Sequence, residues 1–178
     1  GKNMADQLYL KFINFFKNHN LYDEQTFKYI RENAILFDYL EEEKRSFIGC
    51  YYNFDKQGRL IKIVIGVPII KDEQTLLINI HEYIHAISLY SKLGTKCKIG
   101  IEREILPLLY EKIYLNENPN EELERYVNML NQKIIESNQI EYKIALNLQN
   151  ELLEYYYKTK NFDKLKNRAK KLSKKYNK

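Results

Sequence analysis

Hydrophobic residues recur every three to four positions along most of the chain, a pattern typical of amphipathic helices. The N-terminal part predicts two such helices, the second capped near Asp23. Farther on, Pro119 stands at the start of a third pattern, and the segment Ile140 to Tyr157 is apolar on most faces, which predicts a central helix. The residues that carry the three periodic patterns are Leu8, Phe12, Phe15 and Phe16; Phe27, Ile30 and Ala34; and Leu123, Val127, Leu130 and Ile134.

The helical periodicity gives way to strand-like segments in the middle of the chain. Phe47 to Phe54 and Arg59 to Pro68 predict two strands, and Asp55 to Gly58 predicts the turn of a β-hairpin, with a positive φ expected at Gly58. An extended peptide could pair with Lys62 to Gly66, where a glycine lets another backbone come close. The alternative is that the hairpin simply covers one side of the helices.

A long helix is predicted directly after the hairpin, because the chain has no Pro or Gly from Glu73 to Leu93. Asp72 is a good N-cap for this helix, and Gly94 follows as its expected C-terminal stop. The expected fold is therefore α+β and mostly helical, with a small β-hairpin packed beside this helix in a single domain over residues 1–178. The apolar face of the helix is formed by Leu77, Ile80, Ile84 and Ile87.

The same helix contains the sequence His81-Glu82-Tyr83-Ile84-His85, which has the form H-E-x-x-H of zinc metalloproteases. Residues four apart share one face of a helix, so His81 and His85 can both bind one metal ion. Glu82 is turned sideways from them, where it can act as a general base on a water but is badly placed to bind the metal. Two of the 3 His in the chain fall in this pattern among hydrophobic neighbours. We therefore favour a zinc site over two surface histidines that happen to be four apart.

A catalytic zinc ion usually takes three protein ligands and leaves one position for water. No histidine follows His85, so the third ligand is expected to be a carboxylate or Cys97. Glu102 and Glu104 are the candidate carboxylates, in the segment that runs from Gly100 to Glu111. Cys97 is the weaker candidate because it lies in the loop before that segment.

The motif at His81, followed by a helical Glu after such a gap, resembles the gluzincin class of zinc peptidases. Within that class, the segment Glu104 to Glu111 is similar to the thimet oligopeptidase and oligoendopeptidase family, where a second Glu follows the metal-binding Glu by seven positions. The likeness covers about 30 of the 178 residues, and Pro107 is one residue farther from Glu104 than that family's usual proline. The resemblance implies Zn²⁺ bound by His81, His85 and Glu104, with Glu111 supporting the site.

The resemblance also implies a minimal zincin-like core and a residue that stabilises the oxyanion of the reaction. Related enzymes use a downstream His or Tyr for this, and with no downstream His the candidates are Tyr155, Tyr156 and Tyr157. With 16 Tyr in the chain, packing is the stronger explanation for this run. A second group of zinc peptidases, which cleaves repressor proteins, is less similar, because its downstream Ala-Asn-Phe-Ala-like run is absent here.

These features predict a zinc-dependent metallopeptidase that acts on a peptide or protein substrate, with Glu82 as its catalytic base. Two alternatives stay open at this point. One is a non-catalytic or regulatory zinc-binding protein that acts through its basic C-terminal helix. The other is a hydrolase of a non-peptide amide.

The net charge of +5 is distributed unevenly along the chain. Residues 158–178 contain ten Lys or Arg and one acidic residue, so they carry +9 and the rest of the chain carries −4. Apolar residues at intervals of three and four predict a basic amphipathic helix, docked on the core with its charged face in solvent. Nucleic acid or an acidic membrane is a weaker expectation for its partner. The apolar residues are Phe162, Leu165, Ala169, Leu172 and Tyr176.

The sequence predicts neither a transmembrane helix nor a disulfide framework. The run Leu8 to Phe16 is too short and too polar to cross a membrane, and no signal peptide is visible, so we expect a cytoplasmic protein. Two cysteines, Cys50 and Cys97, are too few for a disulfide scaffold, and Cys50 is expected to pack in a strand.

Overall fold

The computed structural model describes residues 3–38 and 45–176. The chain forms two compact units, Gly1–Lys98 and Ile99–Lys178. The first contains α1 (Met4–Asn18), α2 (Glu24–Glu32), β1 (Ile35–Phe37), β2 (Gly49–Phe54), β3 (Leu60–Pro68) and α4 (Glu73–Tyr90). The second contains η1 (Ile101–Glu104), α5 (Ile105–Glu117), α6 (Glu121–Glu136), α7 (Ile140–Thr159), α8 (Phe162–Ser173) and η2 (Lys174–Tyr176).

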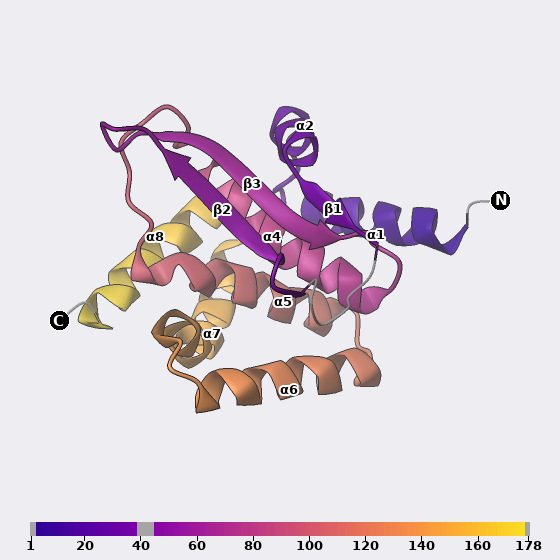
Figure 1. Ribbon diagram of the computed structural model, residues 1–178. Helices are drawn as coiled ribbons and strands as arrows, with labels where there is room; N and C mark the ends of the chain where they lie inside the picture. The colour runs from indigo at the N-terminus through magenta and orange to yellow at the C-terminus, as the bar shows by residue number, and fades with distance from the viewer. Residues whose placement is uncertain (1–2, 39–44, 177–178) are drawn as a thin grey trace. The chain divides into compact units, whose positions relative to one another are not determined.

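The expected mostly helical α+β fold is confirmed, with a small sheet in the first unit (Figure 1). Compact units of this kind can belong to one domain, so the single domain over residues 1–178 stays a prediction.

The sheet has the strand order β1-β3-β2, and its core is the predicted hairpin. β2 and β3 pair antiparallel, with Gly49 opposite Gly66 and Asn53 opposite Lys62. The turn between them places Gly58 at φ +83°, as expected from the sequence. The strands are slightly shorter than predicted at their N-terminal ends, beginning at Gly49 and Leu60.

A peptide was expected to pair with Lys62 to Gly66; β2 occupies one edge of this segment, and pairing at the other edge stays a prediction. β3 is the central strand, with β2 antiparallel along Leu60 to Gly66 and β1 parallel along Gly66 to Pro68. The backbone that comes close to Gly66 is the chain's own, because a Cβ atom there would collide with the carbonyl oxygen of Phe47. The edge strand next to α4 is β2.

The short strand β1 was not predicted from the sequence, where Ala34 was assigned to the second helix. α2 ends at Glu32, and Asn33 closes it with a side-chain amide that donates to the carbonyl oxygen of Tyr29. The next residues are extended and pair with the C-terminal half of β3, Ile35 opposite Gly66. A run of three strand residues has too few positions to show an alternation, so tertiary pairing decides its structure.

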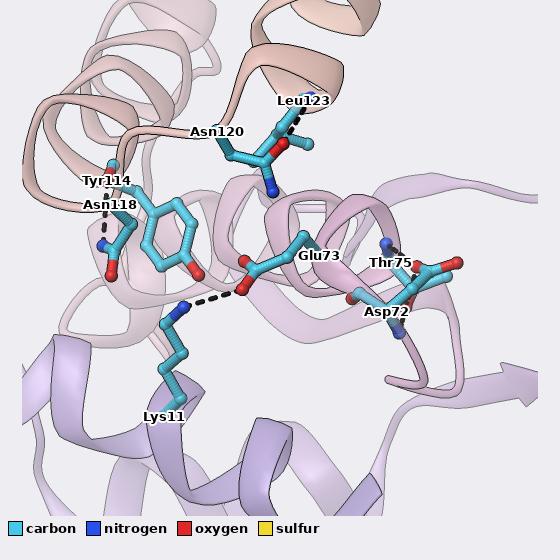
Figure 2. A network of polar contacts seen from close by, with 8 residues as sticks. All are labelled: Lys11, Asp72, Glu73, Thr75, Tyr114, Asn118, Asn120 and Leu123. Atoms are coloured by element: carbon cyan, nitrogen blue, oxygen red, sulfur yellow. Dashed lines mark hydrogen bonds and ion pairs between the residues drawn. The ribbon is translucent and has the colours of Figure 1, made fainter. Parts of the chain in front are cut away.

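α4 begins as predicted at the cap residue Asp72. The Asp72 carboxylate accepts from the backbone N–H of Thr75 at 2.7 Å, and the Thr75 hydroxyl oxygen accepts from the backbone N–H of Asp72 at 3.0 Å (Figure 2). This reciprocal capping box satisfies two donors that a helix start leaves without partners. At the other end the helix stops at Tyr90, three residues before the predicted Leu93, and Gly94 takes φ +82° in the turn that follows.

An aromatic cluster fixes α4 against the two N-terminal helices. The rings of Phe12 and Phe27 lie 4.9 and 5.3 Å from that of Tyr83, centroid to centroid, and Phe16 closes the cluster. Burial raises the pKa of Tyr83, as expected for a phenol removed from water. At the rim of this core, the ammonium group of Lys11 on α1 pairs with the Glu73 carboxylate at 2.6 Å (Figure 2).

In the second unit α7 occupies the centre, as predicted, and contacts η1, α5, α6 and α8. It is apolar along one face rather than most faces, since its buried residues follow a helical spacing. That face consists of Ile144, Ala145, Leu148, Leu152 and Tyr156.

The basic C-terminal segment is docked through its apolar face, as expected. Leu165 and Ala169 are buried, and α8 contacts α7, α5 and η1. The helix is shorter than the predicted 158–178, because Lys160 takes the left-handed conformation at φ 48° and ends α7, after which Asn161 caps α8. Residues 177–178 of the predicted helix lie outside the described residues. None of the helices in the described parts of the chain is long and apolar enough to cross a membrane.

Removal of the α4 cap should destabilise the protein. We expect Asp72→Ala to lower the free energy of unfolding by about 1 kcal/mol, because the N–H group of Thr75 loses its acceptor. The measurement is the urea unfolding curve at constant m-value. Asp72→Asn is the matched control, since Asn caps helices about as well as Asp, and an equal loss in both variants would show that the negative charge acts instead of the cap.

Candidate metal centre

The two histidines of the motif share one face of α4, as their spacing predicted. The His81 and His85 rings are 5.0 Å apart, centroid to centroid, and inclined at 62°. Between them, Tyr83 and Ile84 are buried, with 5% and 0% of their surface exposed, and these two residues anchor the helix in the core. The helix is therefore held from one side while its other side carries both imidazoles.

Glu82 lies on the same helix and is also buried, with 6% of its surface exposed. It stands one position after His81, so its side chain leaves the helix about 100° away from that of His81. This direction suits a residue that acts on a molecule beside the metal. It does not suit a third ligand from the same helical turn, in agreement with the sequence prediction.

Glu104 ends η1 and directly precedes α5. The preceding residue, Arg103, forms an ion pair with Glu141 of α7, with 3.4 Å between their nitrogen and oxygen atoms. Pro107 lies in the first turn of α5, where a missing N–H is tolerated. Glu104 is 6% exposed, so the 3₁₀ turn buries a carboxylate at the start of the following helix.

His81, His85 and Glu104 form a buried group of possible metal ligands. One possible ligand atom from each of His81, His85 and Glu104 lies within 4.8 Å of the other two. Ligands about 2.0–2.1 Å from a tetrahedral ion are roughly 3.4 Å apart, which lies within the 4.8 Å limit of this group. This group could bind a metal ion.

Glu102, the competing carboxylate, is not in this group and folds back onto Gly100, so closely that a Cβ atom at Gly100 would collide with it. Cys97, the other candidate, is also outside the group. It lies in the loop beside the hairpin turn, where its N–H donates to the carbonyl oxygen of Gly58. Cys50 lies in β2, as expected.

Burial of ionisable side chains singles out the same residues. Among the described residues, the buried Glu and His side chains are Glu82, His85 and Glu104, each 6% exposed. A buried charge is costly unless it is paired or binds a metal, so a cluster of such groups marks a functional site more often than a structural one. His81 is partly buried.

A hydrogen-bond partner of His85 was missed in the sequence. The hydroxyl of Tyr52, on β2, lies 3.4 Å from Nδ1 of His85. The alternation of residues 49–54 along the strand predicts which side chains share a face with Tyr52. It does not predict that this face contacts His85, 33 positions farther along the chain. From the sequence, the candidates for a functional tyrosine were Tyr155, Tyr156 and Tyr157, as donors to the oxyanion.

The late tyrosines have packing contacts within the second unit. Tyr156 is buried, and its ring lies 5.7 Å from that of Tyr110, centroid to centroid. Burial, followed by the charge of Glu117, raises the pKa of Tyr156 to about 12. Tyr155 lies beneath the guanidinium of Arg168, and Tyr157 is exposed.

Glu111 lies on α5. It is one of the residues that line a cavity of about 250 Å³ among α5, α6 and α7. It is not part of the three-residue group, and its support of the metal site stays a prediction. The cavity is bordered by both signs of charge and by amides. Its lining consists of Leu108, Glu111, Lys112, Leu115, Glu124, Val127, Asn128, Asn131 and Gln149.

Comparison with known proteins returns no match to a protein-family model, to a curated protein or to a solved structure.

Metal binding should depend on Glu104 and not on Glu102. We expect an added divalent transition-metal ion to raise the melting temperature of the wild-type protein, because a ligand at 100 times its Kd stabilises the folded state by about 2.7 kcal/mol. Glu104→Gln should remove most of this shift. Glu102→Gln, the same change two residues away, should keep it. Loss of the shift in Glu102→Gln alone would move the ligand to that residue.

Proposed function

We propose that this protein is a zinc-dependent metallopeptidase with His81, His85 and Glu104 as metal ligands and Glu82 as general base. The observation that carries the proposal is the convergence of two imidazoles and one carboxylate, with atoms within 4.8 Å of one another, next to a buried Glu on the same helix. Two His and one Glu form the ligand set of several catalytic zinc sites.

The donor chemistry fits zinc better than other common ions. Mg²⁺ and Ca²⁺ prefer carboxylate and carbonyl oxygens, whereas imidazole nitrogens suit zinc and its neighbours among the transition metals. A structural zinc site usually has four Cys or His ligands, and the group here has three donors. A remaining position for water is the arrangement that hydrolysis requires.

A zinc ion held by His81, His85 and Glu104 would supply an activated water and would polarise the carbonyl group of the substrate. The proton transfers are assigned to a residue of the chain. Glu82 accepts a proton from the attacking water and passes it to the nitrogen of the leaving amine, so that its carboxylate is regenerated at the end of each turnover. Its burial lowers the local dielectric constant and strengthens its interaction with the reacting atoms.

The edge strand β2 is the surface that we assign to the substrate. β2 lies next to α4, and the outer side of an edge strand can accept an extended peptide through backbone hydrogen bonds. Tyr51 and Phe54 on this strand are exposed, with 44% and 39% of their surface accessible. This surface suits an extended peptide better than a compact small molecule. It favours peptide bonds over other amides as the substrate.

Glu82→Gln should keep the metal and lose the reaction. The amide matches the carboxylate in shape but cannot accept the proton, so we expect kcat to fall about 10²- to 10⁴-fold while the zinc content stays near that of the wild type. Activity is measured on a mixture of unstructured peptides by mass spectrometry, and zinc by elemental analysis.

The matched control for this experiment is Glu73→Gln. It removes the same charge from the same helix, where Glu73 pairs with Lys11. This control should keep its activity. Full activity in Glu82→Gln would refute the assigned base, and a wild-type protein that takes up no zinc at neutral pH would refute the metallopeptidase as a whole.

A further inference from the structure

The contact between Tyr52 and His85 joins the edge strand to the metal-binding helix. The Tyr52 hydroxyl lies 3.4 Å from Nδ1 of His85, and the tyrosine side chain is partly buried. Tyr52 is held by the register of the hairpin, opposite Ile63 of β3, while β3 itself packs on α4. The hydroxyl is thus positioned by the sheet and not by a mobile loop.

This contact decides which nitrogen of His85 can bind a metal. An imidazole offers Nδ1 and Nε2, and the nitrogen that does not bind the metal normally hydrogen-bonds to a second group. Because Nδ1 faces Tyr52, Nε2 is the nitrogen left for the metal. A neutral His85 that binds through Nε2 carries its proton on Nδ1, and that N–H can donate to the Tyr52 oxygen.

We propose that Tyr52 is the positioning residue of the metal centre, and that its hydroxyl oxygen accepts from Nδ1–H of His85 and so fixes both the tautomer and the orientation of the imidazole. This inference rests on the proposed metal site. Tyr52 acts through His85, because its hydroxyl lies on the side of the ring that faces away from Nε2. It is therefore not the donor that stabilises the oxyanion.

A neutral phenol changes the basicity of a metal-binding imidazole less than the carboxylate that often serves as its hydrogen-bond partner. A carboxylate raises the basicity of the ligating imidazole strongly, whereas a phenol oxygen is a weaker acceptor and adds no charge. The 3.4 Å separation is longer than the usual range of about 2.7–3.2 Å for such a bond. We expect metal binding to shorten it, since the metal keeps the proton on Nδ1.

The test is the zinc affinity of Tyr52→Phe, measured by competition with a chromophoric chelator. Loss of the acceptor should weaken zinc binding about 10- to 100-fold, the range found for such outer partners of metal ligands. Tyr51→Phe is the matched control, because it removes the same hydroxyl from the next residue of the strand, where it donates to the carbonyl oxygen of Phe47. Its zinc affinity should equal that of the wild type.

Two further measurements separate positioning from a general loss of structure. The cobalt-substituted protein should change its visible absorption spectrum in Tyr52→Phe but not in Tyr51→Phe, because the ligand field depends on the orientation of the imidazole. In a His85→Ala background, where the residual zinc binding no longer involves the imidazole, Tyr52→Phe should have no further effect on affinity. An equal loss of affinity in both backgrounds would show that Tyr52 acts on the fold instead, and would overturn the inference.

The other outcomes are equally decisive. Unchanged zinc affinity with a reduced kcat would make Tyr52 a participant in the chemical step and overturn the positioning role. Unchanged affinity with unchanged kcat would overturn it as well. In both cases the metallopeptidase proposal would stand, since the wild type would still bind zinc and hydrolyse peptides. A wild-type protein without zinc affinity would refute both proposals.

Discussion

The rotational setting of α4 is the constraint on which the first unit and the metal centre depend. One side of this helix is fixed by Tyr83 in the aromatic cluster and by its packing on β3. The side that remains carries His81 and His85, and a rotation of the helix by one residue, about 100°, would turn both imidazoles away. The same interactions that form the core therefore aim the ligands.

The capping box at Asp72 determines the position of this helix along its axis. The Asp72 and Thr75 side chains exchange hydrogen bonds with each other's backbone, so local contacts define the first turn. His81 then lies nine residues from the cap, about 13.5 Å along the helix, on the segment that the aromatic cluster holds. The cap at Asp72 and the packing of the aromatic cluster therefore favour the same position of the helix, as expected where local and tertiary preferences are consistent.

The elements that were predictable are those whose signals lie within a few residues of each other. The cap at Asp72, the turn with Gly58 and the periodic faces of the helices all depend on near neighbours, and the structure has them as expected. β1 and the break at Lys160 were missed, because a three-residue strand needs its partner and a left-handed lysine has no strong signature. The contact of Tyr52 with His85 was missed for a related reason, since it depends on how a strand and a helix pack.

In the candidate site, too, the features set by near neighbours in sequence were predictable, and those set by tertiary structure were not. The spacing of His81 and His85 is a local property of one helix, so their common face followed from the sequence. The choice between Glu102 and Glu104 could not be made by spacing, because both stand near the start of one helix. The structure separates them, because the Glu102 side chain folds back onto Gly100, whereas Glu104 is buried and belongs to the group that could bind a metal ion.

The burial of Glu82 is the physical observation behind the proposal that the candidate metal centre is hydrolytic rather than structural. A metal that only braced the fold would gain nothing from a fourth ionisable group, and burying a carboxylate costs free energy unless that group is used. Both cysteines, the residues that structural zinc sites use most, lie outside the group, Cys50 in β2 and Cys97 in a loop. The proposed role of Glu82 as general base would account for a carboxylate buried on the same helix as His81 and His85.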